Sequence, residues 1–64
     1  MEVLINGLPY SIENNSSVNT LIEKLELSGK YAIEINQHII PKSQYNKKIT
    51  GGDKVEIAQA IGGG

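Results

Sequence analysis

The chain has 64 residues, which allow a single domain with a small core. It contains no cysteine, so disulfides, thiolate metal sites and thiol nucleophiles are excluded, and packing alone must hold the fold. Six basic residues stand against seven acidic ones without a basic cluster, which argues against nucleic acid or a membrane surface as partner. Residues 1–6 lack the positively charged start and the long apolar run of a signal peptide or membrane span, so we expect a cytoplasmic protein.

A hairpin is expected at the start of the chain. Residues 3–5 form a short β-rich run that meets Asn6 and Gly7, a dipeptide typical of a two-residue hairpin turn. Residues 8–13 alternate apolar and polar side chains, as in a strand with one buried face. Pro9 has no N–H to donate, which favours an edge position for this second strand.

A helix and a third strand are expected next. Ser16 or Ser17 can cap the start of the helix. The apolar residues that follow are spaced i, i+3, i+4 and i+7, so they share one stripe: Val18, Leu21, Ile22 and Leu25. A serine and a glycine at residues 28–29 predict the end of the helix, and residues 31–36 alternate again as a strand.

The last third of the chain predicts two further strands. The apolar run at residues 39–40 is limited by Pro41 to a brief edge segment. Residues 42–48 are a polar connector with room for one helical turn. After a turn at residues 51–53, residues 54–61 are the longest strand candidate of the chain.

This order of elements implies an α+β fold in which a mixed sheet of four or five strands packs on one helix. We expect one domain over residues 1–61 and a flexible glycine tail over residues 62–64. The helix stripe and the inward strand positions give the expected core: Val3, Ile5, Val18, Leu21, Ile22, Leu25, Ile33, Ile35, Val55 and Ile57.

The interior of the domain offers no constellation for catalysis or metal binding. His38 is the only histidine and has no cysteine to act with, so we interpret it as an exposed turn residue. Asp53 and Glu56 lie in a solvated turn and strand and are interpreted as surface charges. The glycines at residues 51–52 lack the spacing of a phosphate loop and precede a strand. We therefore expect neither an enzyme nor a metal protein.

The terminal Gly62, Gly63 and Gly64 are the stronger functional candidate. Residues without Cβ fit through a cleft too narrow for side chains. The chain ends in a carboxylate, which needs activation, for instance as a mixed anhydride with AMP, before it can transfer its acyl group. Three glycines are also compatible with a simple frayed terminus. Their place directly after the longest strand favours an arm that projects from a rigid element.

A docking surface is expected on the outer face of the sheet. If odd-numbered residues of the last strand face the core, Ala58 and Ala60 face outward beside Leu4 and Ala32. Together these four would make a flat apolar patch, a feature that marks interaction sites. An ordinary scatter of small exposed residues is the alternative.

The whole chain, residues 1 to 64, resembles the sulfur-carrier family of thiamine biosynthesis, ThiS, in the ubiquitin-like β-grasp superfamily. The terminal Gly-Gly is shared with ubiquitin-like modifiers and the molybdopterin sulfur carrier, whereas the segment around residues 35–41 and the short length favour the thiamine branch. The family often has tryptophan near position 45, where this chain has Tyr45, another amphipathic ring. The matching features are the strand ending in Asn6, Ser17-Val18 opening a Leu-rich helix, residues 32–36 followed by Ile40-Pro41, Gly52-Asp53 before the last strand, and Gly63-Gly64.

The resemblance implies a ubiquitin-like β-grasp fold and a cycle run by partner enzymes. An E1-like adenylyltransferase would use ATP to adenylate Gly64, a cysteine-desulfurase relay would supply sulfur, and the thiocarboxylate would feed thiazole synthase. Gly62 and Gly63 would thread through the partner's cleft, and the carrier would bind no cofactor itself. Two alternatives stay open, namely a molybdopterin-type sulfur carrier and a ubiquitin-like protein modifier or binding module.

Overall fold

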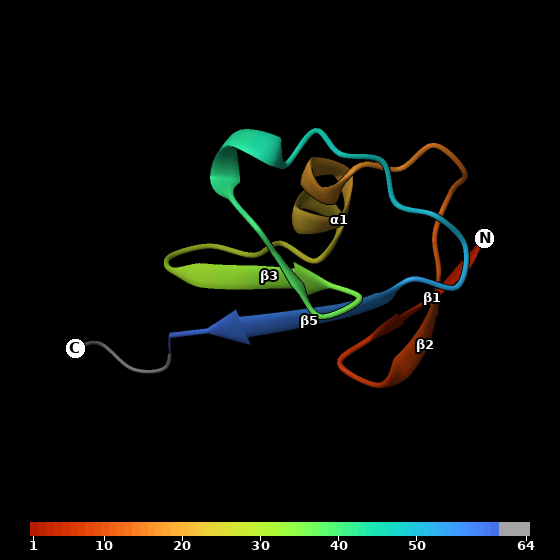
Figure 1. The fold of residues 1–64 in the computed structure, drawn as a ribbon, viewed down its shortest axis with the longest axis horizontal. Coiled ribbons are helices and arrows are strands. Elements are labelled where there is room, and N and C mark those ends of the chain that lie inside the picture. The colour runs from red at the N-terminus through yellow and green to blue at the C-terminus, as the bar shows by residue number, and fades with distance from the viewer. Residues whose placement is uncertain (61–64) are drawn as a thin grey trace.

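A computed structural model describes residues 1–60, in which one helix lies across a five-stranded sheet (Figure 1). The sheet order is β2-β1-β5-β3-β4, with β1 and β5 parallel and all other neighbours antiparallel. This arrangement confirms the predicted mixed sheet on one helix. Residues 61–64 lie outside the described part, and with them the predicted tail and the last residue assigned to the final strand. The strands are β1 (Glu2–Ile5), β2 (Leu8–Ser11), β3 (Tyr31–Ile35), β4 (His38–Ile40) and β5 (Lys54–Gln59).

Two tight turns of the same kind connect the outer strands to the sheet. Asn6 and Gly7 take φ values of 50° and 83°, and Asn36 and Gln37 take 52° and 71°. Two successive positive φ angles are what a type I′ hairpin turn requires. The first turn confirms the Asn-Gly prediction, and the position of Pro9 in an edge strand is confirmed as well.

The helix α1 (Val18–Lys24) begins at a capping box. Ser17 Oγ accepts the backbone N–H of Thr20 at 3.1 Å, and the Ser17 N–H donates to Thr20 Oγ1 at 3.2 Å. Each side chain thus satisfies an amide that the first helical turn leaves unpaired. Of the two serines considered as caps, Ser17 fills the role. Within residues 1–60 no helix is long and apolar enough to cross a membrane.

The helix ends at Lys24, earlier than the stop predicted at residues 28–29. Glu26 takes a φ of 55°, which breaks the helical path. The amides of Glu26 and Leu27 donate to carbonyls in the last turn at 3.1 Å each, the bonding pattern of a Schellman motif. The sequence hid this end because glycine usually occupies the left-handed position, and here a glutamate does.

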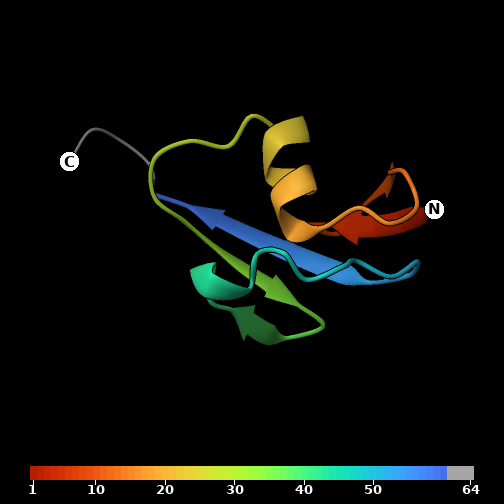
Figure 2. The ribbon, with the colours of Figure 1, turned by 90° about the horizontal axis from the view of Figure 1, so that it is seen from above.

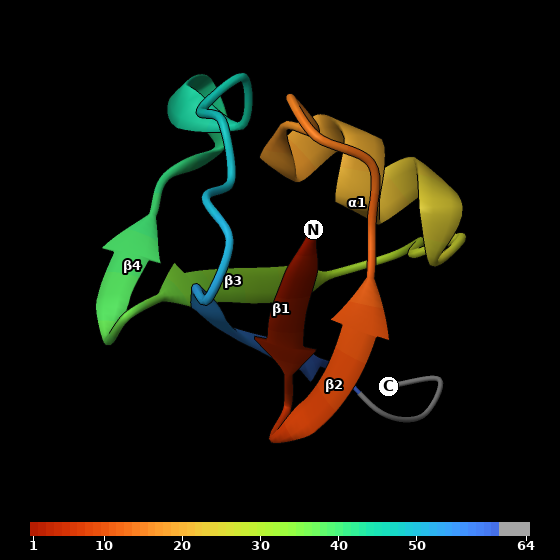
Figure 3. The same cartoon turned by 90° about the vertical axis from the view of Figure 1, so that its right-hand side faces the viewer.

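The core lies between α1 and the concave face of the sheet, which curls around the helix (Figures 2 and 3). Seven of the ten predicted core residues are buried. The other three, Ile22, Leu25 and Ile57, are partly buried and pack against the rest. Four further hydrophobic side chains are buried that were not predicted as core: Ile12, Ile40, Tyr45 and Ile49.

The connector between β4 and β5 closes the core beside the start of α1. After a single 3₁₀ turn, η1 (Lys42–Gln44), Tyr45 turns inward and stacks on Tyr31, with ring centroids 6.3 Å apart. Burial raises the pKa of Tyr45 above its ordinary value, and the neighbouring Tyr31 adds to the effect. The amide of Ile49 donates to the carbonyl of Ser16 at 2.8 Å, which ties the connector to the helix entry.

Candidate functional site

The strand β5 leads directly into the C-terminal residues. It is the central strand of the sheet, with β1 on one side and β3 on the other (Figure 1). The amide of Ala60 still donates to the carbonyl of Lys30 at 3.0 Å, so the sheet holds the chain up to this point. The predicted tail, Gly62, Gly63 and Gly64, lies outside the described residues. The structure describes the strand from which that tail departs.

The number of residues after the sheet limits how far Gly64 can lie from β5. Residues 61–64 follow Ala60, and four residues span at most about 13–14 Å when fully extended. Any enzyme that acts on Gly64 must therefore bring its active site close to the end of β5. The surfaces around that end decide which partner fits.

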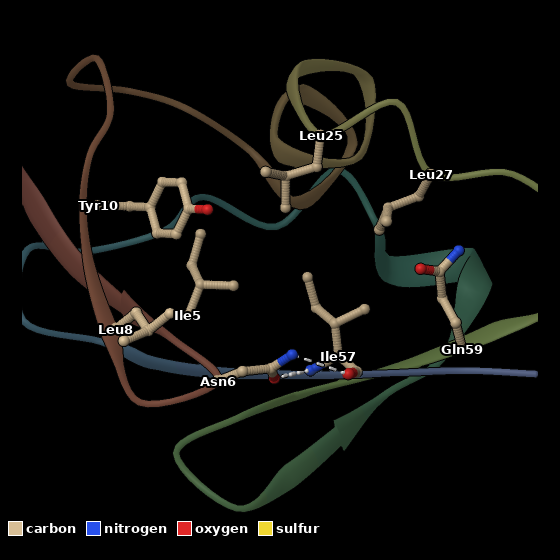
Figure 4. Close-up of a pocket in the computed structure, with 8 residues that line it drawn as sticks. All are labelled: Ile5, Asn6, Leu8, Tyr10, Leu25, Leu27, Ile57 and Gln59. Carbon is tan, nitrogen blue, oxygen red and sulfur yellow. Dashed lines mark hydrogen bonds between the residues drawn. The ribbon is translucent and has the colours of Figure 1, made fainter.

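Two asparagine side chains hold β5 from opposite sides. The Asn6 Oδ1 accepts the N–H of Ile57 at 2.7 Å, and its Nδ2 donates to the carbonyl of the same residue at 3.2 Å (Figure 4). Asn36 Oδ1 accepts the N–H of Lys54 at 3.0 Å, and Nδ2 donates to Asp53 Oδ1 at 3.0 Å. An amide side chain supplies both a donor and an acceptor, so Asn6 acts in place of a paired strand residue. Asn36 instead joins the first amide of β5 to the carboxylate of Asp53.

The outer face of the sheet carries the predicted docking residues, but not as one patch. Ala32 lies directly opposite Ala58, and Ala60 follows at the end of the strand, all three exposed. Leu4 instead pairs with Lys54, at the other end of β5 and about 13 Å from Ala58. The prediction that Leu4 lies beside the alanines is wrong, because the parallel register of β1 and β5 brings it to the start of β5.

A shallow groove of about 490 Å³ lies on the α1 side of the sheet (Figure 4). It runs between β2, the end of α1 and the second half of β5, and none of its lining side chains is charged. The sequence did not predict this groove, because three segments that are distant in the chain form it. The signal in the sequence was the pair of apolar side chains, Leu8 and Tyr10, on an edge strand. The lining residues are Ile5, Asn6, Leu8, Tyr10, Leu25, Leu27, Ile57 and Gln59.

The titratable residues considered for chemistry have structural or surface positions. Asp53 accepts the amide of Thr50 at 2.8 Å as well as the Asn36 side chain, so its carboxylate fixes the turn before β5. His38 and Glu56 are exposed on strands. Within residues 1–60, no three histidine, cysteine, aspartate or glutamate side chains come together as metal ligands.

Comparisons with known proteins agree on one family. The model of the ThiS family matches residues 3–64, including the three terminal glycines. The Sulfur carrier protein ThiS of Escherichia coli is 32% identical, with the match covering all of both chains. A crystal structure of the thiamine biosynthesis protein (ThiS) from Geobacter metallireducens superposes with a TM-score of 0.85 at 23% identity over the whole of both chains, which shows the fold.

Two further relatives carry other names, and one of them is much longer than this chain. The uncharacterized protein ycf40 of Porphyra purpurea is 35% identical over all of this chain and 93% of its own. A thiazole synthase of Paramagnetospirillum magneticum is 39% identical over all of this chain, which spans only 20% of that relative's length. A segment like this chain thus occurs within a much longer protein.

Proposed function

The chain belongs to the ThiS family, and we propose that its sulfur-carrying atom sits on Gly64, the residue that ends the sequence. The protein is then a sulfur carrier of thiamine biosynthesis, a substrate of its partner enzymes rather than a catalyst. The observation that carries the proposal is the family match over residues 3–64, which runs through the terminal glycines. The ubiquitin-like β-grasp fold shared with the Geobacter protein supports it.

The proposed reaction exchanges one oxygen of the terminal carboxylate for sulfur. A carboxylate oxygen of Gly64 attacks the α-phosphorus of ATP in an E1-like adenylyltransferase, and pyrophosphate leaves. The outer sulfur of a persulfide, supplied by a cysteine-desulfurase relay, then attacks the acyl carbon, the bond between that carbon and the AMP oxygen breaks, and AMP leaves. A thiol reductant supplies the two electrons that cleave the resulting acyl disulfide to the thiocarboxylate. The thiocarboxylate that results is the sulfur donor for thiazole synthase. ATP belongs to the adenylating partner, and the carrier supplies only the acyl group.

The body of the domain supplies the docking energy that the tail lacks. Ordering flexible glycines costs about 1–2 kcal/mol per residue or more, so contacts of Gly62 and Gly63 alone leave little net affinity. We assign the exposed cluster of Ala32, Ala58 and Ala60 on the outer face to the adenylating enzyme. It lies at the end of β5, within the reach of the four residues that follow.

The thiazole synthase relative supports the assignment of thiazole synthase as the enzyme that accepts the sulfur. It contains a segment similar to the whole of this chain, so a carrier-like sequence and that enzyme's name occur in one protein. We take thiazole synthase as the enzyme that receives the thiocarboxylate of Gly64.

Intact mass spectrometry tests the proposal directly. We expect the chain, incubated with ATP, the adenylating enzyme and a sulfur source, to gain the mass difference between one sulfur and one oxygen. Fragmentation should place the change on Gly64. A chain that lacks Gly64 and a chain extended past it should both stay unmodified, since the reacting carboxylate is then displaced by about 3.3–3.6 Å. Loading of either variant at the parental rate contradicts the terminal-carboxylate mechanism.

Gly63→Val tests the threading role separately. The variant keeps the terminal carboxylate but adds a β-branched side chain that widens the arm and restricts its backbone. We expect slower loading at unchanged thermal stability, because misplacement by about 1 Å can cost on the order of 100-fold in rate. Loading at the parental rate contradicts a narrow cleft.

A further inference from the structure

The strand β5 has an open edge beyond Ile57 on the side of β1. Among residues 1–60, β1 pairs with β5 only at Lys54 and Val55 and then turns away into the hairpin with β2 (Figure 3). The side chain of Asn6 fills the next position by bonding to Ile57. Strand alternation turns the N–H and C=O of Gln59 to this same side, where no described strand lies beside them.

The groove of Figure 4 lies along this open edge. Ile57 and Gln59 line it from β5, and Leu27 follows the end of α1 above them. On the far side stand two side chains of β2 that the fold leaves exposed, Leu8 at 62% and Tyr10 at 40%. An unpaired backbone edge beside an uncharged apolar groove suits a ligand that brings both a backbone and an apolar side chain.

We propose that an extended segment of thiazole synthase adds to β5 at Gln59 as a short further strand and places an uncharged apolar side chain in the groove. Its backbone pairs with the N–H and C=O of Gln59 that face this edge, as in other cases of strand addition. A charged side chain is disfavoured, because the lining offers no opposite charge to offset its desolvation. This assignment rests on the proposed function, since it concerns the enzyme that accepts the sulfur.

The location of the edge suits an enzyme that acts on the tail, and the thiazole synthase relative that contains a segment like this chain points to the acceptor enzyme as its occupant. Gln59 precedes Ala60, whose bond to Lys30 is the last contact with the sheet within residues 1–60. A strand paired there fixes the base of the tail, and the four residues beyond it reach at most about 13–14 Å into an active site. The alanine cluster proposed for the adenylating enzyme lies on the opposite face of the sheet. The two enzymes thus contact β5 from different sides.

A charge placed on the rim of the groove tests the apolar contact. We expect Leu8→Glu to weaken binding of the intact chain to thiazole synthase by about tenfold or more, measured by titration calorimetry. The matched control is Ile39→Glu, because Ile39 is also an exposed apolar residue of an edge strand, at 74%, but lies on β4 away from the groove. Equal effects of the two variants, or no effect of Leu8→Glu, overturn the proposal.

A second pair of variants tests the backbone contact. Gln59→Pro removes an N–H that faces the open edge, whereas Gln59→Ala keeps it and loses only the side chain. We expect the proline variant to bind thiazole synthase several-fold more weakly than the alanine variant. In the parent, hydrogen exchange at the Gln59 amide should slow when the enzyme is added. Equal affinities and unchanged exchange contradict strand addition, and protection that grows with the concentration of the carrier alone assigns the edge to a second copy instead.

The two proposals fail in different ways. If the parent chain gains no sulfur at Gly64, the proposed function is wrong. If the parent is loaded normally and Leu8→Glu still binds thiazole synthase like the parent, only the groove is assigned wrongly. Absence of any binding between the parent and thiazole synthase overturns the groove proposal without touching the loading step.

Discussion

Asn6 combines two properties that few residues share. Its φ of 50° lies in the left-handed region, which asparagine tolerates better than most residues other than glycine. Its side chain at the same time makes two hydrogen bonds to the backbone of Ile57 across the end of β1. Glycine would tolerate the positive φ of the turn but has no side chain to bond Ile57 in β5. Glutamine has the same amide group on a side chain that is one methylene longer. Asn6 is one of the features that this chain shares with the ThiS family, and these two properties give a physical reason for an asparagine at this position.

Asn6→Ala should therefore destabilise the domain by about 1–3 kcal/mol, because it removes two exposed hydrogen bonds and forces an alanine backbone to positive φ. Urea denaturation followed by circular dichroism measures the change. Asn14→Ala is the control, since Asn14 is exposed and no side-chain hydrogen bond involves it within residues 1–60. If the two variants unfold at the same urea concentration, the Asn6 contacts contribute nothing to the free energy of unfolding.

The helix α1 was predicted from its apolar spacing, and the structure separates the contributions of its residues. Leu21 is 1% exposed, while Leu25 caps the helix and is only partly buried. We expect Leu21→Ala to cost about 2–5 kcal/mol and Leu25→Ala less, because a half-exposed side chain leaves a smaller cavity. The midpoints of thermal unfolding should follow that order. A Leu21→Ala protein that melts like the parent would contradict the packing of α1 on the sheet.

The elements that were predicted correctly are those with a regular period. Alternation predicted β2 and β3, and the 3.6-residue spacing predicted α1. Tyr45 and Ile49 were missed because they lie in an irregular connector whose burial depends on distant contacts, such as the bond from Ile49 to Ser16. Leu4 was misplaced for a related reason, since a sequence shows which face a strand residue takes but not the register between β1 and β5.

At the scale of the whole molecule, β5 separates two surfaces that meet at the base of the tail. The α1 side holds the uncharged groove, and the outer side holds the exposed pair of Ala32 and Ala58, directly opposite each other. In the cycle that we propose, the chain visits two enzymes in sequence and presents the same terminus to both. Separate docking faces let the affinity for one enzyme change without altering the affinity for the other.

Ala58→Lys tests the outer face as the docking surface for the adenylating enzyme. A lysine at the centre of the exposed alanine cluster adds bulk and charge to a flat contact, so we expect binding to weaken by about tenfold or more. Its melting curve should match that of the parent, because Ala58 faces solvent. Ser43→Lys makes the same change of charge in η1, away from the outer face, and should bind like the parent. If both lysine variants lose affinity equally, net charge rather than the alanine surface governs the encounter, and if neither does, the adenylating enzyme docks elsewhere.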